Sequence, residues 1–339
     1  MSRTVVDTWS YTHAGYPETL KFTTTSIPST PSPHHVLLRI HAVSLNPVDV
    51  QLMNLVLNNL PYLNGAKTPG RDFSATVLAA SEESGFKRDD EIMGISMSTT
   101  IGFLREVVHL DVRQAVLIKK PANLDWVKAA SLPLVWLTAK TSVDRCIPFM
   151  KASNATQNKL AVLGGSSSTG IYTILLAKRY GWRVLATCSG RNVEFVKSLG
   201  ADQVVDYTTS PDAVVNAIKD FAPSAIVDNV GGTECVGLAP QYVTIVGDKT
   251  SRSTMGGSLL YLTYPTMVFR WLMGRIGLGS SYECIILDPR KEWLEEIGTL
   301  QEDQVVIDSV FKFGQTMEAF EKMNTARCKG KVVVVIEEE

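Results

Sequence analysis

The chain has 339 residues, 45% of them hydrophobic and 20% charged, and its formal net charge is −1. That length supports two domains, and the near-neutral charge argues against a protein that binds nucleic acid or a membrane surface through general electrostatics. The five cysteines are dispersed and have neither disulfide nor metal-site spacing, which indicates a reducing compartment. The first ten residues contain no apolar core and no long apolar run follows, so we expect a cytoplasmic protein without a targeting peptide or spanning helix.

The first part of the chain, residues 1–124, reads as mostly β-structure. Proline and glycine punctuate it, as at 29–33 and 68–70. Apolar runs typical of strands occupy 36–42, 75–79 and 106–110.

From residue 125 the pattern changes to alternating helices and strands, which predicts a parallel sheet. The expected helices are 126–139 with a kink near Pro133, 171–180, 192–199 and 212–220. The expected strands are 160–163, 183–187, 203–205, 225–230 and 242–246, followed later by 283–287, 310–313 and 331–336. We therefore predict an α/β fold with a discontinuous first domain, 1–124 and 281–339, and a nucleotide-binding domain at 125–280.

The stretch 159–189 carries the strongest functional signal. An apolar strand, a Gly/Ser-rich turn, a helix and a second apolar strand follow one another, as in the first half of a dinucleotide-binding unit. In such a unit the pyrophosphate of the ligand lies at the N-terminus of the helix. Gly165 and Gly170 permit the tight turn, although Ser167 stands where the usual fingerprint has its middle glycine. Ile171 follows Gly170, so the turn does not match a nucleotide triphosphate loop.

The end of the second strand predicts which dinucleotide is bound. An NAD site usually offers Asp or Glu to the ribose about twenty residues after the glycines. Here Ser189 and Arg191 occupy that region, and no acid follows before Glu194. Because a hydroxyl donor and a fixed positive charge suit a 2′-phosphate, we expect NADPH rather than NADH.

Short motifs recur in order along nearly the whole chain: SLNPVD at 44–49, PGRDFS at 69–74, AASLP at 129–133, LGAD at 199–202, DNVGG at 228–232 and KGK at 329–331. Together with the glycine turn, this set resembles the medium-chain dehydrogenase/reductase superfamily, in its zinc-free quinone oxidoreductase (zeta-crystallin-like) branch. The GRD and DNVGG forms look most like relatives of the reticulon-4-interacting mitochondrial oxidoreductase. The resemblance implies a doubly wound Rossmann sheet, a mostly β GroES-like domain and a homodimer.

The resemblance also implies cofactor contacts in several parts of the chain. They are Gly165, Ser166, Ser168, Thr169 and Gly170 at the pyrophosphate, Ser189 and Tyr207 at the 2′-phosphate and adenosine end, and Val230, Gly231, Val246, Arg327 and Lys329 along the rest of the cofactor. Val230 and Gly231 would lie at a strand end, where parallel sheets bind their ligands.

Zinc-dependent members of the superfamily carry a Cys near 44–46, a His-Glu pair where Arg71 and Asp72 stand here, and a lobe of four cysteines. This sequence has none of these ligands, so we expect no zinc. Without a Lewis acid an alcohol hydroxyl is not readily ionised, whereas hydride addition to an electron-poor C=C bond does not need that ionisation. We therefore expect an NADPH-dependent reductase of an activated alkene or a quinone.

Two side chains are candidates for catalysis. Asn46 belongs to the Asn-Pro-x-Asp motif of the family, although a turn role before Pro47 is equally open. Tyr62 lies where relatives sometimes place an acid-donating tyrosine. A rival hypothesis is an NADPH-binding regulatory protein with little turnover, left open by Ser167 and by the unmatched segment 250–280. Within that segment, residues 265–276 would form a lid or a dimer contact in preference to a membrane-touching helix.

Overall fold

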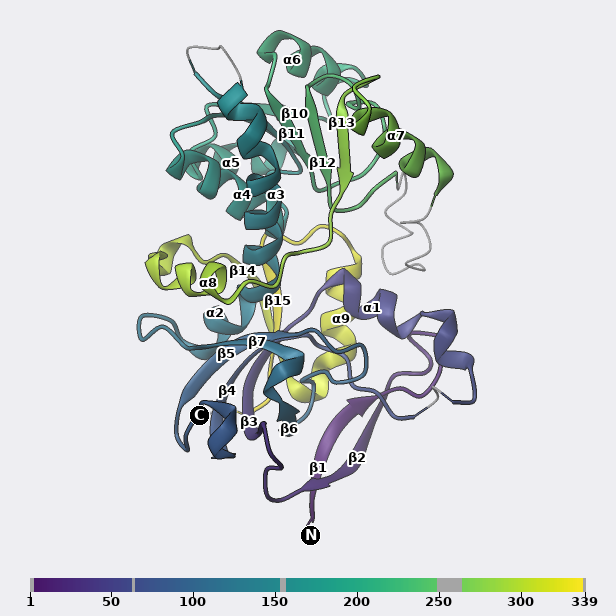
Figure 1. Ribbon diagram of the computed structural model, residues 1–339, viewed down its shortest axis with the longest axis vertical. Helices are drawn as coiled ribbons and strands as arrows, with labels where there is room; N and C mark the ends of the chain where they lie inside the picture. Colours follow the sequence, from purple (N-terminus) through teal and green to yellow (C-terminus); the bar gives the residue numbers. More distant parts are fainter. Residues whose placement is uncertain (1–2, 63–64, 153–156, 249–263, 338–339) are drawn as a thin grey trace. The chain divides into compact units, whose positions relative to one another are not determined.

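The computed structural model describes residues 3–62, 65–152, 157–248 and 264–337. These residues form two compact units (Figure 1). The first unit contains the described residues up to Leu134 and from Pro289 onwards. The second unit contains the described residues from Val135 to Asp288. The first unit is therefore discontinuous in the sequence.

The first unit is built on a seven-stranded sheet in the order β14-β15-β3-β4-β5-β7, with β6 paired to β3. An antiparallel hairpin of β1 and β2 stands apart from this sheet. The strands are β1 (Arg3–Ser10), β2 (Lys21–Pro28), β3 (His35–Ser44), β4 (Asp72–Ala80), β5 (Glu91–Ser96), β6 (Val107–Asp111), β7 (Ala115–Lys119), β14 (Ile307–Lys312) and β15 (Lys331–Val335).

Side chains along β3 alternate in burial, and Val36, Leu38 and Ile40 are fully buried, as expected where one face of a sheet covers a core. The short helices of this unit are α1 (Pro47–Met53), α2 (Trp126–Ser131), α8 (Lys291–Glu295) and α9 (Thr316–Asn324). Helix α9 packs on β14 and β15 and places Phe320 in the same core. The strands predicted at 36–42, 75–79 and 106–110 are confirmed by β3, β4 and β6.

The second unit contains a six-stranded parallel sheet in the order β10-β9-β8-β11-β12-β13. The strands are β8 (Lys159–Leu163), β9 (Arg183–Cys188), β10 (Gln203–Asp206), β11 (Ala225–Asp228), β12 (Gln241–Thr244) and β13 (Ser281–Cys284). The helices are α3 (Pro133–Ala152), which begins in the first unit, α4 (Ser168–Arg179), α5 (Val193–Ser198), α6 (Ala213–Phe221) and α7 (Pro265–Arg275).

This sheet winds outward from β8 through β9 to β10 and then restarts at β11, next to β8, in the opposite direction. Strands β8 and β11 are buried along nearly their whole length, as parallel strands covered on both faces should be. The strand order therefore reverses between β8 and β11. In open α/β sheets ligands bind at such a reversal, beyond the carboxyl ends of the strands.

Both unit boundaries lie beyond the expected positions at 124/125 and 280/281. The first falls within α3, because α2 packs on β3, β4 and β15 of the first unit. The second follows Asp288, because β13 pairs with β12 as a strand of the parallel sheet. The single kinked helix expected at 126–139 is two helices, since α2 ends at Ser131 and α3 begins at Pro133. Proline lacks an N–H group and suits a first helical position.

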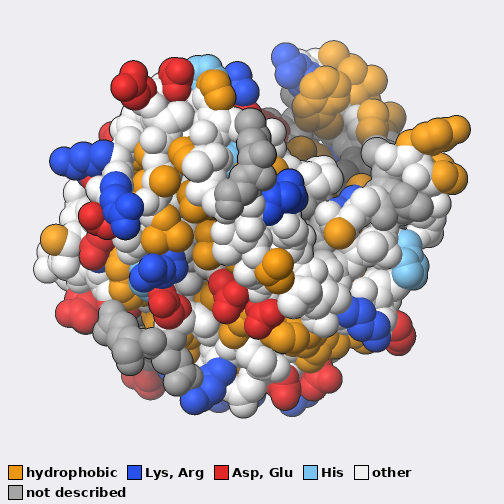
Figure 2. Space-filling view, turned by 90° about the horizontal axis from the view of Figure 1, so that it is seen from below, with side chains coloured by type: hydrophobic (Ala, Val, Ile, Leu, Met, Phe, Trp, Pro, Cys, Tyr) orange, Lys and Arg blue, Asp and Glu red, His pale blue; other side chains and the backbone are white. Residues whose placement is uncertain are grey.

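Acidic and basic side chains are interspersed over the face shown in Figure 2. This distribution agrees with the net charge of −1 and differs from the basic stripe of a nucleic-acid-binding face. In the part of the chain that the structure describes, no helix is long and apolar enough to cross a membrane.

Candidate functional site

The predicted dinucleotide turn follows β8 at the point where the strand order reverses. Gly164 has a positive φ of 76°, and its N–H donates to the Thr187 hydroxyl at 3.0 Å. A Cβ on Gly165 would lie 2.9 Å from the Cβ of Ala186, and one on Gly170 would lie 2.2 Å from the carbonyl oxygen of Gly164. These close approaches require glycine at both positions. The result is a tight turn directly before the N-terminus of α4.

Ser167, the departure from the usual fingerprint, has a structural explanation. Its backbone is extended, with φ −72° and ψ 157°, so no glycine is needed there. Its hydroxyl accepts the N–H of Gly170 at 3.1 Å and caps the N-terminus of α4. Ser167 therefore stabilises the helix start at which a pyrophosphate would bind.

The loop after β11 is organised by the buried carboxylate of Asp228. It accepts the N–H groups of Val230 and Gly231, each at 2.9 Å, and the hydroxyl of Thr244 at 2.8 Å. The Thr244 oxygen in turn accepts the N–H of Val246 at 3.2 Å. Burial raises the pKa of Asp228. The structure thus links three predicted cofactor residues, Val230, Gly231 and Val246, through one hydrogen-bond network.

Asn229 lies between this loop and the glycine turn. Its Nδ2 donates to the carbonyl of Leu163 at 3.0 Å, while its Oδ1 is buried without a hydrogen-bond partner among the described residues. An unsatisfied buried acceptor, a tight turn bounded by glycines and a capped helix N-terminus together fit a bound dinucleotide. The DNVGG motif was the signal for Asn229, although the side chain itself was not predicted.

The predicted 2′-phosphate end lies after β9 and β10. Asn192 connects the glycine turn to the end of β9, because its Nδ2 donates to the hydroxyls of Ser166 at 3.1 Å and Ser189 at 3.4 Å. Arg191 is exposed, and Tyr207 is 40% exposed. Their positions at this edge suit the ends of a dinucleotide, and their contact with one stays a prediction.

Asp206 is an acid beside this predicted phosphate position that no sequence motif indicated. Its carboxylate accepts the hydroxyl of Thr208 at 2.7 Å and its N–H at 2.9 Å, and it also accepts the N–H of Gly190. The Thr208 hydroxyl is the main cause that lowers the pKa of Asp206. Parallel pairing of β9 and β10 brings Asp206 here, so spacing after the glycines could not reveal it.

Arg327 and Lys329 lie in the first unit, in the turn between α9 and β15. Both side chains are exposed. The Arg327 N–H donates to the Thr325 hydroxyl at 3.2 Å, and the Lys329 N–H donates to Asp308 at 2.7 Å. Their contact with a cofactor stays a prediction.

Asn46 is 1% exposed and belongs to a buried polar network in the first unit. Its Nδ2 donates to Asp72 at 2.9 Å, and its Oδ1 accepts from the ammonium of Lys331. Lys331 also donates to Asp72 at 3.4 Å and to the carbonyl of Leu45 at 3.0 Å. Burial raises the pKa of Asp72 and lowers that of Lys331. Both ends of the Asn46 amide are therefore engaged within the protein, and its catalytic role stays a prediction.

The same network includes residues from the two stretches, 44–46 and 71–72, in which the family resemblance places the zinc ligands of metal-dependent members. Asn46 and Asp72 stand there, and the cation between them is the ammonium of Lys331. No group of three or more His, Cys, Asp or Glu side chains in the described ranges could hold a metal ion.

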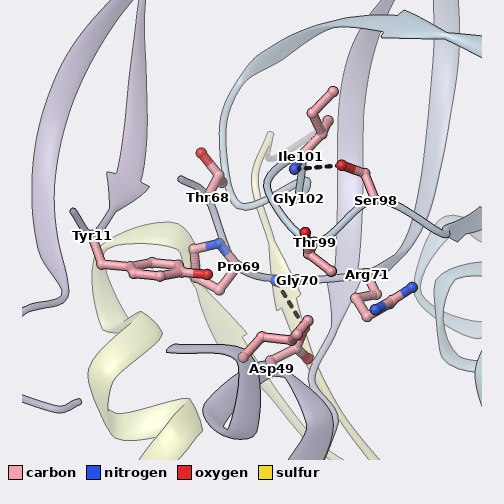
Figure 3. Close-up of a pocket in the computed structure, with 11 residues that line it drawn as sticks. Tyr11, Asp49, Thr68, Pro69, Gly70, Arg71, Ser98, Thr99, Ile101 and Gly102 are labelled. Atoms are coloured by element: carbon pink, nitrogen blue, oxygen red, sulfur yellow. Dashed lines mark hydrogen bonds between the residues drawn. The ribbon is translucent and has the colours of Figure 1, made fainter. Parts of the chain in front are cut away.

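A small pocket lies beside this network in the same unit (Figure 3). Its polar lining comes from Tyr11, Asp49, Thr68, Arg71, Ser98 and Thr99. The Asp49 carboxylate accepts the N–H of Gly70 at 3.1 Å and that of Asn46 at 2.8 Å, and burial raises its pKa to about 6. The lining comes from four separate segments, of which the motifs at 44–49 and 69–74 contribute Asp49, Pro69, Gly70 and Arg71.

Tyr62 is not part of this pocket. It follows the 3-10 turn Val56–Asn59, and its side chain is 96% exposed. The expected acid-donating tyrosine is therefore not enclosed by its unit, because this short turn carries it out into solvent.

Two family models match the chain: the alcohol dehydrogenase GroES-like domain at residues 32–121 and the zinc-binding dehydrogenase at residues 199–334. A GroES-like unit together with a glycine turn on a parallel sheet defines a nicotinamide-dependent oxidoreductase. The chain belongs to the medium-chain dehydrogenase/reductase superfamily, in its quinone oxidoreductase-like branch near RTN4IP1. The predicted family and fold class are confirmed.

Similar proteins align along nearly the whole chain. NAD(P)H oxidoreductase RTN4IP1, mitochondrial, from Bos taurus is 30% identical over 98% of this chain and 89% of its own length. The quinone-oxidoreductase homolog, chloroplastic, from Spinacia oleracea is 24% identical over 95% of each protein. The solved structure of the quinone oxidoreductase from Coxiella burnetii shares the fold, with a TM-score of 0.79 and 24% identity over 98% of this chain and 100% of that one.

The expectation of a cytoplasmic location is wrong. The bovine relative is mitochondrial and the spinach relative is chloroplastic, which points to an organelle. Dispersed cysteines indicate only a reducing compartment, and that property does not separate the cytoplasm from the interior of an organelle.

Proposed function

We propose that this protein is a zinc-independent, NADPH-dependent reductase of an activated C=C bond or a quinone. The observation that carries the proposal is the buried network of Asn46, Asp72 and Lys331, in which an ammonium pairs with Asp72 where the family resemblance would place zinc ligands. An ammonium can neutralise a carboxylate, but it has no open coordination position for an alcohol oxygen. The site is therefore better suited to hydride addition than to the oxidation of an alcohol.

A bound nicotinamide cofactor would supply the hydride. The turn from Gly164 to Gly170 would hold its pyrophosphate through backbone N–H groups and the N-terminus of α4. Arg191 and Ser189 favour a 2′-phosphate. The Asp206 carboxylate is the main argument for NADH, but it already accepts three hydrogen bonds from Thr208 and Gly190. We therefore propose NADPH.

The substrate class follows from the chemistry of the addition. Hydride attack on a β-carbon moves negative charge onto a conjugated oxygen, so a carbonyl or quinone oxygen and a hydrogen-bond donor beside it are needed. The names of the spinach relative and of the Coxiella structure both contain a quinone oxidoreductase, which supports a quinone as one member of this class.

The rival hypothesis of an NADPH-binding protein with little turnover loses one of its two supports. Ser167 caps α4 and does not disrupt the turn. The other support is segment 250–280, of which residues 250–263 lie outside the described part of the chain. Its described part includes α7, where Arg270 pairs with Asp248 at 2.5 Å and Met267 is buried. With one arginine engaged internally, we favour a dimer contact or a lid over a membrane contact for α7, and we propose a homodimer.

The experiment that tests the proposal is NADPH and NADH oxidation against a quinone, a linear enal, a cyclic enone and a simple ketone, each with and without chelator. We expect chelator-insensitive turnover with NADPH on the quinone or the enone. Chelator-sensitive turnover would contradict zinc independence. Tight NADPH binding without turnover on any acceptor would favour the rival hypothesis.

A further inference from the structure

Asn192 joins two loops of the second unit that lie apart in the sequence. It ends the 3-10 turn Gly190–Asn192, which follows β9, and its own N–H donates to the carbonyl of Ser189 at 2.8 Å. Its Nδ2 donates to the hydroxyl of Ser166 in the glycine turn, at 3.1 Å, and to the hydroxyl of Ser189, at 3.4 Å. One side-chain amide therefore contacts both serines that the proposed function assigns to phosphate groups of the cofactor.

The direction of these two hydrogen bonds decides what the serines can offer a ligand. An amide NH₂ group only donates, whereas a hydroxyl has one hydrogen to donate and two lone pairs that accept. In both contacts the serine oxygen is therefore the acceptor, and neither contact uses the hydroxyl hydrogen. Ser166 and Ser189 are half-buried, so each remains partly accessible to a ligand. Asn192 thus favours the donor role of two hydroxyls that could otherwise accept or donate.

The 3-10 turn that carries Asn192 is also held from the neighbouring strand. The carboxylate of Asp206 accepts the N–H of Gly190, and the N–H of Tyr207 donates to the carbonyl of Cys188 at 3.1 Å. The turn is thus fixed to the end of β10 and, through Asn192, to the glycine turn after β8. Groups that are ordered before a ligand arrives lose less conformational entropy when it binds. An ionised phosphate oxygen accepts strong hydrogen bonds, so hydroxyl donors ordered in this way suit it.

We propose that Asn192 is a positioning residue for the cofactor, which directs the hydroxyl hydrogens of Ser166 and Ser189 toward the pyrophosphate and the 2′-phosphate of NADPH. This inference rests on the proposed NADPH dependence. Asn192 itself need not touch a phosphate, because it acts through the two serines. Its removal should therefore weaken the binding of NADPH, which has both phosphate groups, more than that of NADH, which has only the pyrophosphate.

Asn192→Ala tests the proposal by fluorescence titration with NADPH and NADH. We expect the Kd for NADPH to rise roughly tenfold, because two hydrogen bonds to charged oxygens weaken, and the Kd for NADH to rise roughly threefold. The matched control is Asn216→Ala, which removes an exposed asparagine of α6 and should keep both Kd values within about twofold. Asn192→Leu keeps the approximate shape of the side chain and serves if Asn192→Ala does not fold.

A mutant cycle separates positioning from a merely structural role. If Asn192 acts through the serines, Asn192→Ala should change the NADPH Kd less than about twofold in the Ser166→Ala/Ser189→Ala background. A rise by the same factor with and without the serines would overturn the assignment, as would wild-type binding by Asn192→Ala or an equal rise for both dinucleotides. Because the readout is binding, a wild type that binds NADPH but reduces no acceptor would contradict the proposed reductase and not this role. A wild type that binds neither dinucleotide would contradict both.

Discussion

The two units build their candidate sites from different parts of the polypeptide. In the second unit, the site after β8 consists mainly of backbone: glycines without a Cβ and the N–H groups at the start of α4. In the first unit, the site rests on buried charged side chains, above all Asp72 and Lys331. A backbone site depends on local conformation, whereas a buried ionic network depends on the balance of its charges. Mutations in the first unit's network should therefore lower mainly the stability, whereas mutations in the second unit's turn should weaken mainly the binding of the cofactor.

The largest effect is expected when the ionic network loses its cation. Lys331→Met leaves the buried carboxylate of Asp72 without its partner, and breaking a buried pair in this way costs about 3–5 kcal/mol of stability. Urea denaturation measures the loss. The double variant Lys331→Met/Asp72→Asn should regain part of it, since the unpaired charge is gone. A single variant as stable as the wild type would show that charge balance does not hold this unit together.

The pH dependence of stability tests the same unit from the acidic side. Burial raises the pKa of Asp49 from 3.8 to about 6, so the native state holds this proton more tightly than the unfolded chain does. The contribution of Asp49 is thus fully present below pH 4 and is lost as the pH rises to about 6, by about 2–3 kcal/mol. Urea denaturation at several pH values should show that this fall is absent in Asp49→Asn.

Asp90 provides the control for this measurement. The pKa of Asp90 is lowered, first by the N–H of Lys87 and then by the ammonium of Lys119, each bonded to its carboxylate at 3.0 Å, so its contribution is lost as the pH falls. Asp90→Asn should therefore change the pH profile in the opposite sense. The same change in both variants would contradict the assignment to Asp49.

In the glycine turn after β8, we expect substitutions to weaken cofactor binding by steric distortion of the backbone. Gly170→Ala places a Cβ against the Gly164 carbonyl, and overpacking of this kind costs about 1–3 kcal/mol. Because the turn must shift, we expect the NADPH Kd, measured by fluorescence titration, to rise at least roughly tenfold. Gly279→Ala, where a Cβ would meet nothing within 4 Å, should bind NADPH like the wild type. Unchanged binding by Gly170→Ala would place the pyrophosphate elsewhere.

The smallest effect is expected at the exposed edge of the second unit. Arg191→Ala should raise the NADPH Kd by roughly tenfold, because one charged hydrogen bond to the 2′-phosphate is lost, and it should leave the NADH Kd unchanged. Lys197→Ala, which removes an exposed lysine paired with Glu194, is the matched control. Equal binding of both dinucleotides by the wild type would contradict the predicted preference and direct attention to Asp206.

The second unit could be predicted well from the sequence, because its buried strands are continuous apolar runs and glycines mark its turns. Strands β8, β9 and β10 lie within about two residues of their predicted positions. Asp206 was missed because strand pairing, and not sequence spacing, brings it beside Gly190.

The first unit was harder to predict. The hairpin β1–β2 was missed, since its strands are rich in Thr, Ser and charged residues and contain no continuous apolar run. Strands β5 and β7 were missed although both are mostly apolar. The buried network of Asn46, Asp72 and Lys331 could not be predicted for another reason. Lys331 bonds to Asn46 across 285 residues of sequence, and no local pattern encodes such a contact.

The cation of this network has one more consequence. A bound metal leaves by mass action, so the stability that it contributes varies with the free metal concentration. The ammonium of Lys331 is covalently part of the polypeptide, so it cannot dissociate from Asp72 into solution. The stability of the first unit should thus not change when a chelator is added or metal is scarce. Its buried charges are balanced as soon as the chain folds, with no need to bind an ion.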